Sequence, residues 1–504
     1  MINVIIPTVG LGSRMGNFTK NLNKALLPYT GKPVLSHIIE QFPIDTHFII
    51  PVGYLSAQII DFCKVAYPDR NITIVHVDDW TSKKAGTAYT LKCCREYITG
   101  PFWYVPCDTF FDEEVLNRID DNDCYFIKNV GAAETENYTT FDINDNKITN
   151  IFFKERTVAG PAYTGLAFIH NYERFFSMLS SSDSVEFIDV IMPGSLVCSL
   201  DTWLDFGNSD IYELAVRETQ SFDFSKPEEI TYICNNKVVK WWLNPTVAEK
   251  KYAKILANPA VYPDNCRYRN NWLVYDFFPG TTLYKHNNPD SFSNLLDWLD
   301  KKVWIKTERD ISKYSAEFYK TKSLARIKQF REKYPILPNI NYVDGVKIDE
   351  TIIDRIDWEY LSNTNLNGLM HGDLQFDNII VNKEGQFILI DWRHEFSGLV
   401  DSGDIYYDLA KMWGGLIINY SEIKNNNFKI DISEDRVTLD IPNIEYIEQY
   451  QNLLKKYILE NSLDYKKVQL LVPVIFLNMS PLHVAPFDLF LWYLGIKLLH
   501  ESIL

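Results

Sequence analysis

Residues 370–381 read Met-His-Gly-Asp-Leu-Gln-Phe-Asp-Asn-Ile-Ile-Val, with an aspartate and an asparagine five positions apart. The chain continues with Ile-Leu-Ile-Asp-Trp at 388–392 and with Gly-Asp-Ile-Tyr-Tyr-Asp-Leu-Ala-Lys at 403–411. The apolar runs on either side of the polar residues 382–385 predict a strand, a turn and a second strand. An acid on a loop, followed by an amide and then by an acid after the second strand, indicates phosphoryl transfer from ATP.

Phosphoryl transfer needs few reactive groups. One acid orients the acceptor hydroxyl and takes its proton, while an amide and a second acid hold Mg²⁺ across the β- and γ-phosphates. We predict Asp373 as this base, with Asn378 and Asp391 as the Mg²⁺ ligands. The residues expected to brace and support the loop are His371, Asp404 and Asp408.

These segments resemble the aminoglycoside phosphotransferase and choline kinase family, whose pattern is HGDxxxxN, then IDW, then a helix with D-L-A. The resemblance implies a two-lobed, protein-kinase-like α+β domain over 223–504 that uses ATP. Its small lobe would cover about 223–280 and its helical lobe about 281–504. In the small lobe, Lys240 looks like the lysine that contacts the α- and β-phosphates, and Glu249 looks like its partner on the following helix.

The N-terminal region carries a second phosphate-binding pattern. An apolar run at 2–7 predicts a buried strand, and Gly-Leu-Gly-Ser-Arg-Met-Gly follows it at 10–16. Glycines after a strand leave backbone N–H groups open to phosphates, because no Cβ blocks the approach. The rival interpretation is a dinucleotide fingerprint. Arg14 inside the turn and Lys24 after it favour a triphosphate.

Together with four later segments, this turn resembles the sugar-nucleotide pyrophosphorylase type of nucleotidyltransferase. The matching segments are Asn23-Lys24-Ala25-Leu26-Leu27-Pro28, Gly86-Thr87-Ala88, Pro106-Cys107-Asp108-Thr109, Tyr163-Thr164-Gly165-Leu166 and Trp203-Leu204-Asp205-Phe206-Gly207. Asn23 stands where the family usually has proline. The resemblance implies an α/β domain over 1–222 with a Rossmann-like, mostly parallel sheet.

The resemblance also implies roles for single residues. Arg14 and Lys24 would offset charge on the phosphates of a nucleoside triphosphate, and Asp108 and Asp205 would hold Mg²⁺. The residues assigned to the nucleotide are Gly10, Leu11, Gly12, Ser13, Gly86 and Thr87, and those assigned to the acceptor are Tyr163, Gly165, Lys154 and Glu186. Simpler alternatives stay open for three positions: a strand-end cap for Asp205, a solvated side chain for Lys154 and a helix-surface acid for Glu186.

Charge and length exclude several classes of function. The chain has 504 residues, with 50 Lys and Arg against 66 Asp and Glu, which gives a net charge of −16. Duplex nucleic acid and anionic membranes attract basic surfaces, so neither is expected as the main partner. Residues 468–487 carry no charge, but three prolines argue against a membrane-inserted helix. The N-terminus has no basic region, so we expect a cytoplasmic protein. A homo-oligomer is compatible with the sequence.

The two resemblances together predict a bifunctional enzyme with small-molecule substrates. One half would phosphorylate a hydroxylated metabolite, for which we favour a sugar. The other would join that phosphate to CTP, UTP, dTTP or GTP and release pyrophosphate, with Mg²⁺ at both sites. The product would be a nucleoside-diphosphate precursor for surface glycan or capsule synthesis. One alternative is a choline or amino-alcohol kinase fused to a CTP:phosphocholine-type cytidylyltransferase. Another is an active transferase with a non-catalytic kinase-like binding module.

Overall fold

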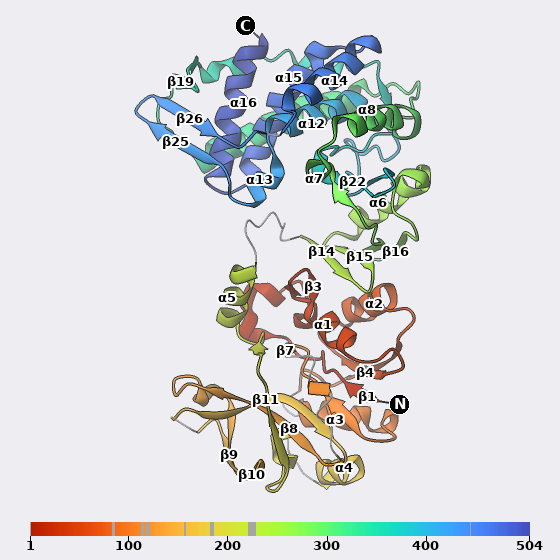
Figure 1. Ribbon diagram of the computed structural model, residues 1–504, viewed down its shortest axis with the longest axis vertical. Helices are drawn as coiled ribbons and strands as arrows, with labels where there is room; N and C mark the ends of the chain where they lie inside the picture. The colour runs from red at the N-terminus through yellow and green to blue at the C-terminus, as the bar shows by residue number, and fades with distance from the viewer. Residues whose placement is uncertain are drawn as a thin grey trace. The chain divides into compact units, whose positions relative to one another are not determined.

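The structure, a computed structural model, describes residues 2–82, 86–111, 115–116, 121–155, 158–181, 186–219, 228–443 and 445–503. The chain forms two compact units (Figure 1). The first contains residues 2–219 and 228–243, and the second contains residues 244–503. The predicted boundary between residues 222 and 223 lies outside the described residues.

The first unit is built on a nine-stranded sheet with the order β5-β4-β1-β6-β11-β8-β12-β10-β9. In it, β1 (Asn3–Ile5) pairs in parallel with β4 (His47–Val52) and β6 (Phe102–Tyr104), and β4 pairs in parallel with β5 (Asn71–His76). Strands β1 and β6 are fully buried, which explains why they read as apolar runs. The α/β class is as predicted, and antiparallel pairings predominate from β11 onward.

The remaining strands of this sheet are β8 (Cys124–Val130), β9 (Thr139–Asn144), β10 (Lys147–Phe153), β11 (Gly160–Ile169) and β12 (Leu196–Ser199). Two small ladders are formed by β2 (Pro28–Tyr29) with β3 (Lys32–Pro33), and by β7 (Thr109–Phe111) with β13 (Trp203–Asp205). The α-helices of the unit are α1 (Val34–Gln41), α2 (Ser56–Ala66), α3 (Thr87–Cys94), α4 (Tyr172–Ser181) and α5 (Ser209–Thr219).

The strand order creates the crevice in which ligands of open α/β sheets bind. From β1 the chain runs to β4 and β5 on one side, and it then returns to β6 on the other side of β1. At such a reversal the connections leave on opposite faces, so a crevice opens beyond the carboxyl ends of the two central strands. The glycine-rich turn follows β1 and Asp108 follows β6. The fold therefore brings these two segments to one place.

A hairpin follows the first sheet along the chain, formed by β14 (Glu229–Cys234) and β15 (Lys237–Trp242). Its turn residues, Asn235 and Asn236, both have positive φ (49° and 55°), as two-residue hairpin turns require. The Asn235 N–H donates to Glu40 Oε1 at 2.9 Å, so the hairpin packs on the first unit. The sequence pattern predicted this hairpin.

The second unit is mainly helical. Its longer helices are α6 (Pro245–Ala257), α8 (Pro289–Trp298), α10 (Lys322–Lys333), α12 (Ile405–Ile417), α14 (Ile447–Glu460), α15 (Tyr465–Met479) and α16 (Phe487–Ile503). Its shorter helices are α7 (Leu283–His286), α9 (Ser312–Ala316), α11 (Trp358–Ser362) and α13 (Tyr420–Lys424). Helices α12, α14, α15 and α16 lie side by side and form its helical core (Figure 1).

Short strands in small sheets complete the second unit. They are β16 (Arg267–Arg269), β17 (Trp272–Asp276), β18 (Thr281–Thr282), β19 (Tyr342–Val343), β20 (Val346–Lys347), β21 (Asn367–Gly368), β22 (Ile379–Val381), β23 (Phe387–Leu389), β24 (Gly403–Asp404), β25 (Lys429–Ser433) and β26 (Arg436–Asp440). The antiparallel pair of β22 and β23 is the strand-turn-strand predicted after the catalytic pattern. It sets Ile379 opposite Leu389, so the residues that flank the pair lie close together.

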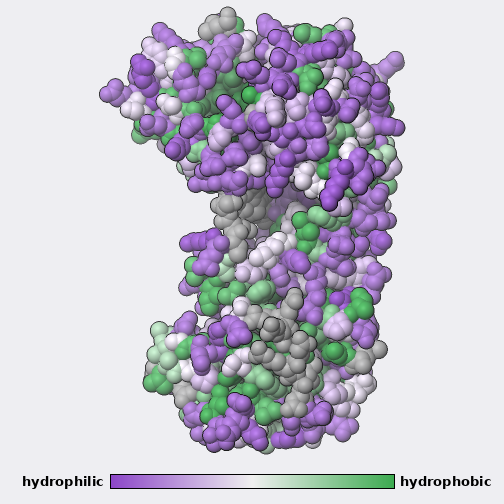
Figure 2. All heavy atoms as spheres, in the orientation of Figure 1, coloured by the Kyte–Doolittle hydropathy of each residue, from purple (hydrophilic) through white to green (hydrophobic). Residues whose placement is uncertain are grey.

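The uncharged stretch 468–487 runs through the end of α15 into the start of α16, and its apolar side chains are mostly buried. Pro473 lies inside α15. Hydrophilic residues cover most of the visible face of the second unit (Figure 2). Of the helices in the described ranges, none has the length and apolar character needed to cross a membrane.

A glycine at the crevice of the first unit offers a stability test. Gly165 in β11 has φ of +87°, and a Cβ there would lie 2.6 Å from Pro106 Cγ. We expect Gly165→Ala to destabilise the unit by about 3 kcal/mol, because a left-handed backbone cost adds to a steric clash. Urea unfolding measures the change.

The control is Gly194→Ala, where φ is +93° and a Cβ would meet nothing within 4 Å. It carries only the backbone cost, about 1 kcal/mol. Equal losses in the two variants would show that the contact between position 165 and Pro106 does not constrain this edge of the crevice.

Candidate active sites

The glycine-rich turn of the first unit is open at its surface. Gly12 and Gly16 have φ of 64° and 53°, which glycine adopts without strain. The Thr19 hydroxyl donates to the Gly12 carbonyl at 3.0 Å, and this bond holds the two ends of the turn together. A Cβ at Gly10 would meet no atom within 4 Å, and Leu11 is 53% exposed. The residues predicted to contact a nucleotide here are therefore accessible.

Asn23 holds the segment that carries Lys24. Its buried amide donates to the Thr8 carbonyl at 3.0 Å and to the Tyr54 carbonyl at 2.8 Å, while its oxygen accepts from the Ala25 N–H at 3.0 Å. These bonds join the connection after β1 to the one after β4. Asn23 thus fixes the start of the short helix that carries Lys24, at the position where the resembling family has proline.

Four residues from distant parts of the chain converge at Gly207. A Cβ at this position would lie 2.7 Å from Asp108 Oδ2, 2.9 Å from Asp205 Oδ1 and 3.3 Å from Arg14 Nη2. Lys24 Nζ lies 2.7 Å from the same Asp108 oxygen. The pairing of β7 with β13 sets Asp205 opposite Thr109 and so beside Asp108. Only glycine at position 207 leaves this space open.

The surroundings shift the pKa values of the two acids in opposite directions. Burial alone would raise the pKa of Asp108, but Lys24 outweighs it and lowers that pKa. Burial lowers the pKa of Lys24, but the negative charge of Asp108 raises it. The net effect is a rise, so the lysine stays protonated. The pKa of Asp205 is raised by burial and by the charge of Asp108. The Tyr138 hydroxyl donates to Asp205 Oδ2 at 3.2 Å.

These two carboxylates fit Mg²⁺. Mg²⁺ takes hard oxygen ligands and is commonly held by one or two carboxylates together with substrate phosphates. Within the described ranges no group of three or more His, Cys, Asp or Glu side chains could hold a metal, so Mg²⁺ at Asp108 and Asp205 would need oxygens from a ligand. The ion would supply charge neutralisation at the phosphates.

Two of the predicted acceptor residues, Tyr163 and Gly165, lie on β11 and connect through aromatic contacts to the strand that precedes Asp108. The Tyr163 hydroxyl donates to its own strand at the Gly165 carbonyl, 2.9 Å away, and its ring stacks on Phe187 with centroids 6.2 Å apart. Phe187 also stacks on Tyr104, at 4.6 Å, just before the segment that ends in Asp108. Burial comes first among the causes that raise the Tyr104 pKa, and Asp108 contributes to the rise.

The other predicted contacts of this unit are less enclosed. Lys154 is exposed, and its Nζ lies 5.6 Å from the centroid of the Phe153 ring. Glu186 is also exposed; burial raises its pKa and Lys154 lowers it. Gly86 caps α3, and the Thr87 hydroxyl bonds to Tyr104. Thr87 therefore reaches the crevice, whereas Lys154 and Glu186 lie at its surface.

In the second unit, His371 holds the loop that carries Asp373. Its Nδ1 accepts from the Asp373 N–H at 3.2 Å, so the proton is on Nε2, which donates to the Ile390 carbonyl at 2.8 Å. Burial and Lys254 lower the His371 pKa to about 3. A neutral ring bridges the loop to the end of β23, next to Asp391.

Asp408 supports the loop from α12. It accepts the His371 N–H at 2.7 Å and the Gly372 N–H at 2.6 Å, and the Trp304 indole N–H donates to it at 3.1 Å. Gly372 has φ of +84°, so glycine is needed at this turn. Asp404 acts one step away from the loop. It caps α12 through the Tyr406 N–H, accepts from the hydroxyls of Tyr319 and Thr364 and pairs with Lys467 at 3.2 Å.

Asp373 forms a close ion pair that sequence analysis did not identify. Lys411 Nζ lies 2.8 Å from Asp373 Oδ1, and the lysine side chain is 7% exposed. Burial would raise the pKa of Asp373, but Lys411 and Arg393 lower it to about 2. Burial lowers the pKa of Lys411, but the negative charge of Asp373 raises it, and the net effect is a rise. The predicted base is thus ionised and oriented.

The predicted Mg²⁺ ligands of this unit flank the strand pair. The Asn378 amide donates to the Asp373 carbonyl at 2.8 Å, and the Ile390 N–H donates to the Asn378 carbonyl at 3.0 Å. Asp391 follows with φ of +57°, a conformation that non-glycine residues rarely adopt. One carboxylate and one amide suit a metal that also binds phosphate oxygens, so the pair fits Mg²⁺ bound with ATP.

The predicted lysine and glutamate of the small lobe lie in different units. Lys240 is buried in β15 of the first unit, and Glu249 is exposed on α6 of the second. Helix α6 instead buries two other lysines against the loop region. Lys251 donates to the Trp392 carbonyl, and Lys254 donates to the Arg393 carbonyl at 3.1 Å.

Three contacts were not predicted: Tyr138 on Asp205, Trp304 on Asp408 and Lys411 on Asp373. Only the third had a sequence signal. Lys411 follows Asp408 by three residues in the quoted segment, and residues three apart share a helix face. Because Asp408 faces the loop, a lysine three residues later on α12 is expected to face it too.

Comparison with known proteins identifies part of the second unit. Residues 251–424 match the model of the Phosphotransferase enzyme family. The second unit therefore carries a phosphotransferase domain, and its fold class is as predicted. The match includes the loop at 370–378, Asp391 and Lys411, and it leaves out Lys240 and Glu249.

The N-terminal region is similar to curated proteins of another kind. It is 28% identical to the bifunctional protein GlmU of Methanococcus vannielii over 160 residues, which are 30% of this chain and 35% of that protein. Its identity to the bifunctional protein GlmU of Methanocaldococcus jannaschii is 25% over 149 residues, which are 29% of this chain and 35% of that protein. The chain spans about a third of the length of the curated relatives it matches.

Solved structures of nucleotidyltransferases are also similar. A UDP-glucose pyrophosphorylase complexed with UDP-glucose has a TM-score of 0.37 and 15% identity, over 43% of this chain and 98% of that chain. A CTP:phosphocholine cytidylyltransferase from Streptococcus pneumoniae has a TM-score of 0.36 and 20% identity, over 43% of this chain and 98% of that chain. Likenesses this distant do not identify a nucleotide or an acceptor.

The ion pair of Lys411 with Asp373 can be tested by unfolding. Lys411→Met keeps the apolar stem and removes the charge, which leaves a mostly buried carboxylate without its lysine. We expect the free energy of unfolding at pH 7 to fall by about 2 kcal/mol. The double variant Lys411→Met/Asp373→Asn should recover about half of this loss, because no buried charge remains.

The pH dependence has a definite sign. In the wild type the Asp373 pKa lies below its ordinary 3.8, so its contribution to stability is complete above that value and is lost as the pH falls toward about 2. In Lys411→Met the pKa rises, so acid partly recovers the loss. Urea unfolding at several pH values measures both effects. Equal destabilisation of the single and double variants at every pH would contradict the ion-pair account.

Proposed function

We propose that the chain is a bifunctional enzyme whose two units catalyse consecutive phosphate chemistry. The second unit transfers the γ-phosphoryl group of ATP to a hydroxyl of a small metabolite. The first unit then joins the new phosphate to a nucleoside triphosphate and releases pyrophosphate. The observation that carries this proposal is that in each unit the aspartate of the predicted site forms an ion pair with a lysine, Asp108 with Lys24 and Asp373 with Lys411.

In the second unit, Asp373 would accept the proton of the acceptor hydroxyl as the oxygen attacks the γ-phosphorus. The bond to the β,γ-bridging oxygen breaks, and ADP leaves. Lys411 keeps Asp373 ionised and fixes its direction, and His371 and Asp408 keep the loop in place. Asn378 and Asp391 would hold Mg²⁺, which neutralises charge on the phosphates.

In the first unit, a phosphate oxygen of the phosphorylated metabolite would attack the α-phosphorus of a nucleoside triphosphate. The bond between the α-phosphorus and the α,β-bridging oxygen breaks, and pyrophosphate leaves. All reactants are anions, so catalysis depends on positioning and on offsetting charge. Arg14 and Lys24 supply fixed positive charge at the crevice, and Asp108 and Asp205 would hold Mg²⁺.

The favoured product is a nucleoside-diphosphate sugar or a related activated building block for a surface glycan. The sugar assignment rests on three segments that resemble those of sugar-nucleotide pyrophosphorylases, at residues 86–88, 163–166 and 203–207. The two alternatives are an amino-alcohol kinase with a CTP-dependent transferase, and a kinase-like module that only binds ligands. The half-buried Asp373, which Lys411 keeps ionised, supports an active kinase over a binding module, because an ionised carboxylate at this position is what proton acceptance from a hydroxyl requires.

Two substitutions separate the half-reactions. We expect Asp373→Asn to lower ADP formation at least a hundredfold and to leave pyrophosphate release from a supplied acceptor phosphate within twofold of wild type. We expect Asp108→Asn to do the reverse. ADP and pyrophosphate are measured separately with Mg²⁺, ATP, each nucleoside triphosphate and a panel of sugars, sugar 1-phosphates, choline, ethanolamine and their phosphates.

Asp45→Asn and Glu384→Gln are the controls, since both side chains are exposed and lie outside the two sites. If Asp373→Asn leaves acceptor-dependent ADP formation intact, the kinase assignment is wrong. If Asp108→Asn leaves pyrophosphate release intact, the assignment of the first unit is wrong.

A further inference from the structure

Cationic side chains crowd around Asp373. Lys411 lies against its carboxylate at 2.8 Å. Arg393, from the segment after β23, and Lys322, at the start of α10, lie over the same Phe318 ring, with their charged atoms 5.2 Å and 4.1 Å from its centroid. Arg393 also lies over the Tyr407 ring at 5.6 Å and donates to the Tyr407 hydroxyl at 3.5 Å.

A fourth cation, Arg326, stands one helical turn after Lys322 on the same face of α10. Burial together with Arg393, Lys411 and Arg326 lowers the pKa of Lys322 to about 6. Burial and Arg393 lower the pKa of Arg326 as well. Asp373 is the one acid that counters this crowding at Lys322. A bound anion would raise the pKa of Lys322 again and so restore its positive charge at neutral pH.

Protein carboxylates do not balance these cationic side chains. Lys322, Arg326 and Arg393 form no ion pair with any residue in the described part of the chain, and Arg326 donates to the neutral Gln329 at 3.0 Å. Gathering like charges in a half-buried place costs free energy that a bound anion offsets. The arrangement is thus suited to a ligand that brings negative charge to this side of Asp373.

The position of the cluster separates it from the predicted metal ligands. Lys322 and Arg326 come from α10, which packs on α15 in the helical part of the unit. Asn378 and Asp391 flank β22 and β23, where Mg²⁺ and the ATP phosphates are expected. Asp373 interacts with both groups: the Asn378 amide donates to its carbonyl at 2.8 Å, and its charge raises the pKa of Lys322.

The same contacts count against a cationic acceptor. A quaternary ammonium group is recognised by open aromatic faces. The rings of Phe318 and Tyr407, which lie nearest the cluster, are already covered by Lys322 and Arg393. A choline-like acceptor would displace these cations from the rings and would meet their repulsion.

We propose that the acceptor of the second unit is a hydroxylated metabolite with an anionic group, a carboxylate or a phosphomonoester, which Lys322, Arg326 and Arg393 bind while Asp373 faces its hydroxyl. The inference rests on the proposed kinase function and names its substrate class. Lys411 is a positioning residue in this account, since its partner is Asp373 itself.

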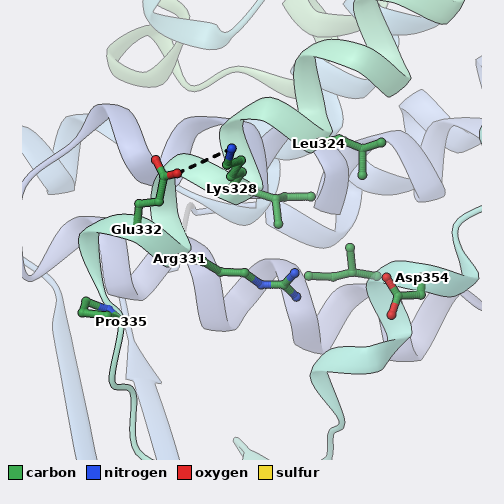
Figure 3. A pocket seen from close by; sticks show the side chains of 8 residues that line it. Leu324, Lys328, Arg331, Glu332, Pro335 and Asp354 are labelled. Atoms are coloured by element: carbon green, nitrogen blue, oxygen red, sulfur yellow. Dashed lines mark ion pairs between the residues drawn. The ribbon is translucent and has the colours of Figure 1, made fainter.

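The other face of α10 offers a matched control. Residues two apart on a helix point to nearly opposite sides, so Leu324 and Lys328 face away from the cluster. They line a separate pocket of about 430 Å³, where Lys328 pairs with Glu332 at 3.7 Å (Figure 3). Lys328→Gln therefore removes one positive charge from the same helix without touching the cluster.

The test measures ADP formation by the full chain with two matched acceptor series. One is glycerol, D-glycerate and sn-glycerol 3-phosphate, and the other is D-glucose, D-glucuronate and D-glucose 6-phosphate; choline is the cationic member. We expect a charged member of a series to have kcat/KM at least tenfold above its neutral member and above choline. The better of carboxylate and phosphate identifies the anionic group.

Variants then locate the effect. We expect Lys322→Gln and Arg326→Gln each to raise the KM for the charged acceptor at least tenfold and to leave the KM for ATP within twofold. Lys322→Arg should stay near wild type, and so should Lys328→Gln. Circular dichroism and the pyrophosphate-releasing activity of the first unit show whether each variant is folded.

The outcomes separate the two proposals. A preference for the neutral members or choline would overturn the anionic acceptor while leaving the kinase assignment in place. The same holds if Lys322→Gln and Arg326→Gln raise the KM for ATP but not for the acceptor, because the cluster would then bind the nucleotide. No ADP with any acceptor, charged or not, would overturn the kinase function and this inference with it.

Discussion

Lys24 lies 2.7 Å from Asp108 in the first unit, and Lys411 lies 2.8 Å from Asp373 in the second. Each aspartate is largely enclosed, and burial by itself would favour its protonated form. A protonated acid could neither hold Mg²⁺ nor accept a proton from a hydroxyl. The lysine reverses this tendency in both units, so the chemistry of each site depends on one ion pair.

The rest of each fold places the two ends of that pair. In the first unit, the reversal of strand order between β1 and β6 brings the segment of Lys24 to the segment of Asp108. In the second, α12 supplies both Asp408, which holds the loop backbone, and Lys411, which holds its carboxylate. Both arrangements use rigid elements to fix a short segment, which gives the precise geometry that transfer reactions need.

Much of each site could be predicted from sequence, because short segments carry it. Asn378 follows Asp373 by five residues, and a tight hairpin returns the chain to Asp391, so spacing alone brings them together. The resemblance to nucleotidyltransferases placed Asp108 and Asp205 in one site, and the pairing of β7 with β13 brings them together.

Long-range contacts could not be predicted in this way. Tyr138 and Trp304 meet their aspartates through tertiary packing that has no local pattern. By contrast, local alternation predicted the strands and the turn of the hairpin at 229–242.

Phosphate transfer through both units can be followed with one label. The full chain would be incubated with Mg²⁺, [γ-³²P]ATP, an accepted hydroxylated substrate and an unlabelled nucleoside triphosphate. The account predicts that the label moves to the substrate and then appears in the nucleotide-linked product, as the phosphate next to the substrate, with none in pyrophosphate. Labelled substrate phosphate that never enters a nucleotide product, with any of the four nucleoside triphosphates, would contradict the claim that the two units catalyse consecutive steps.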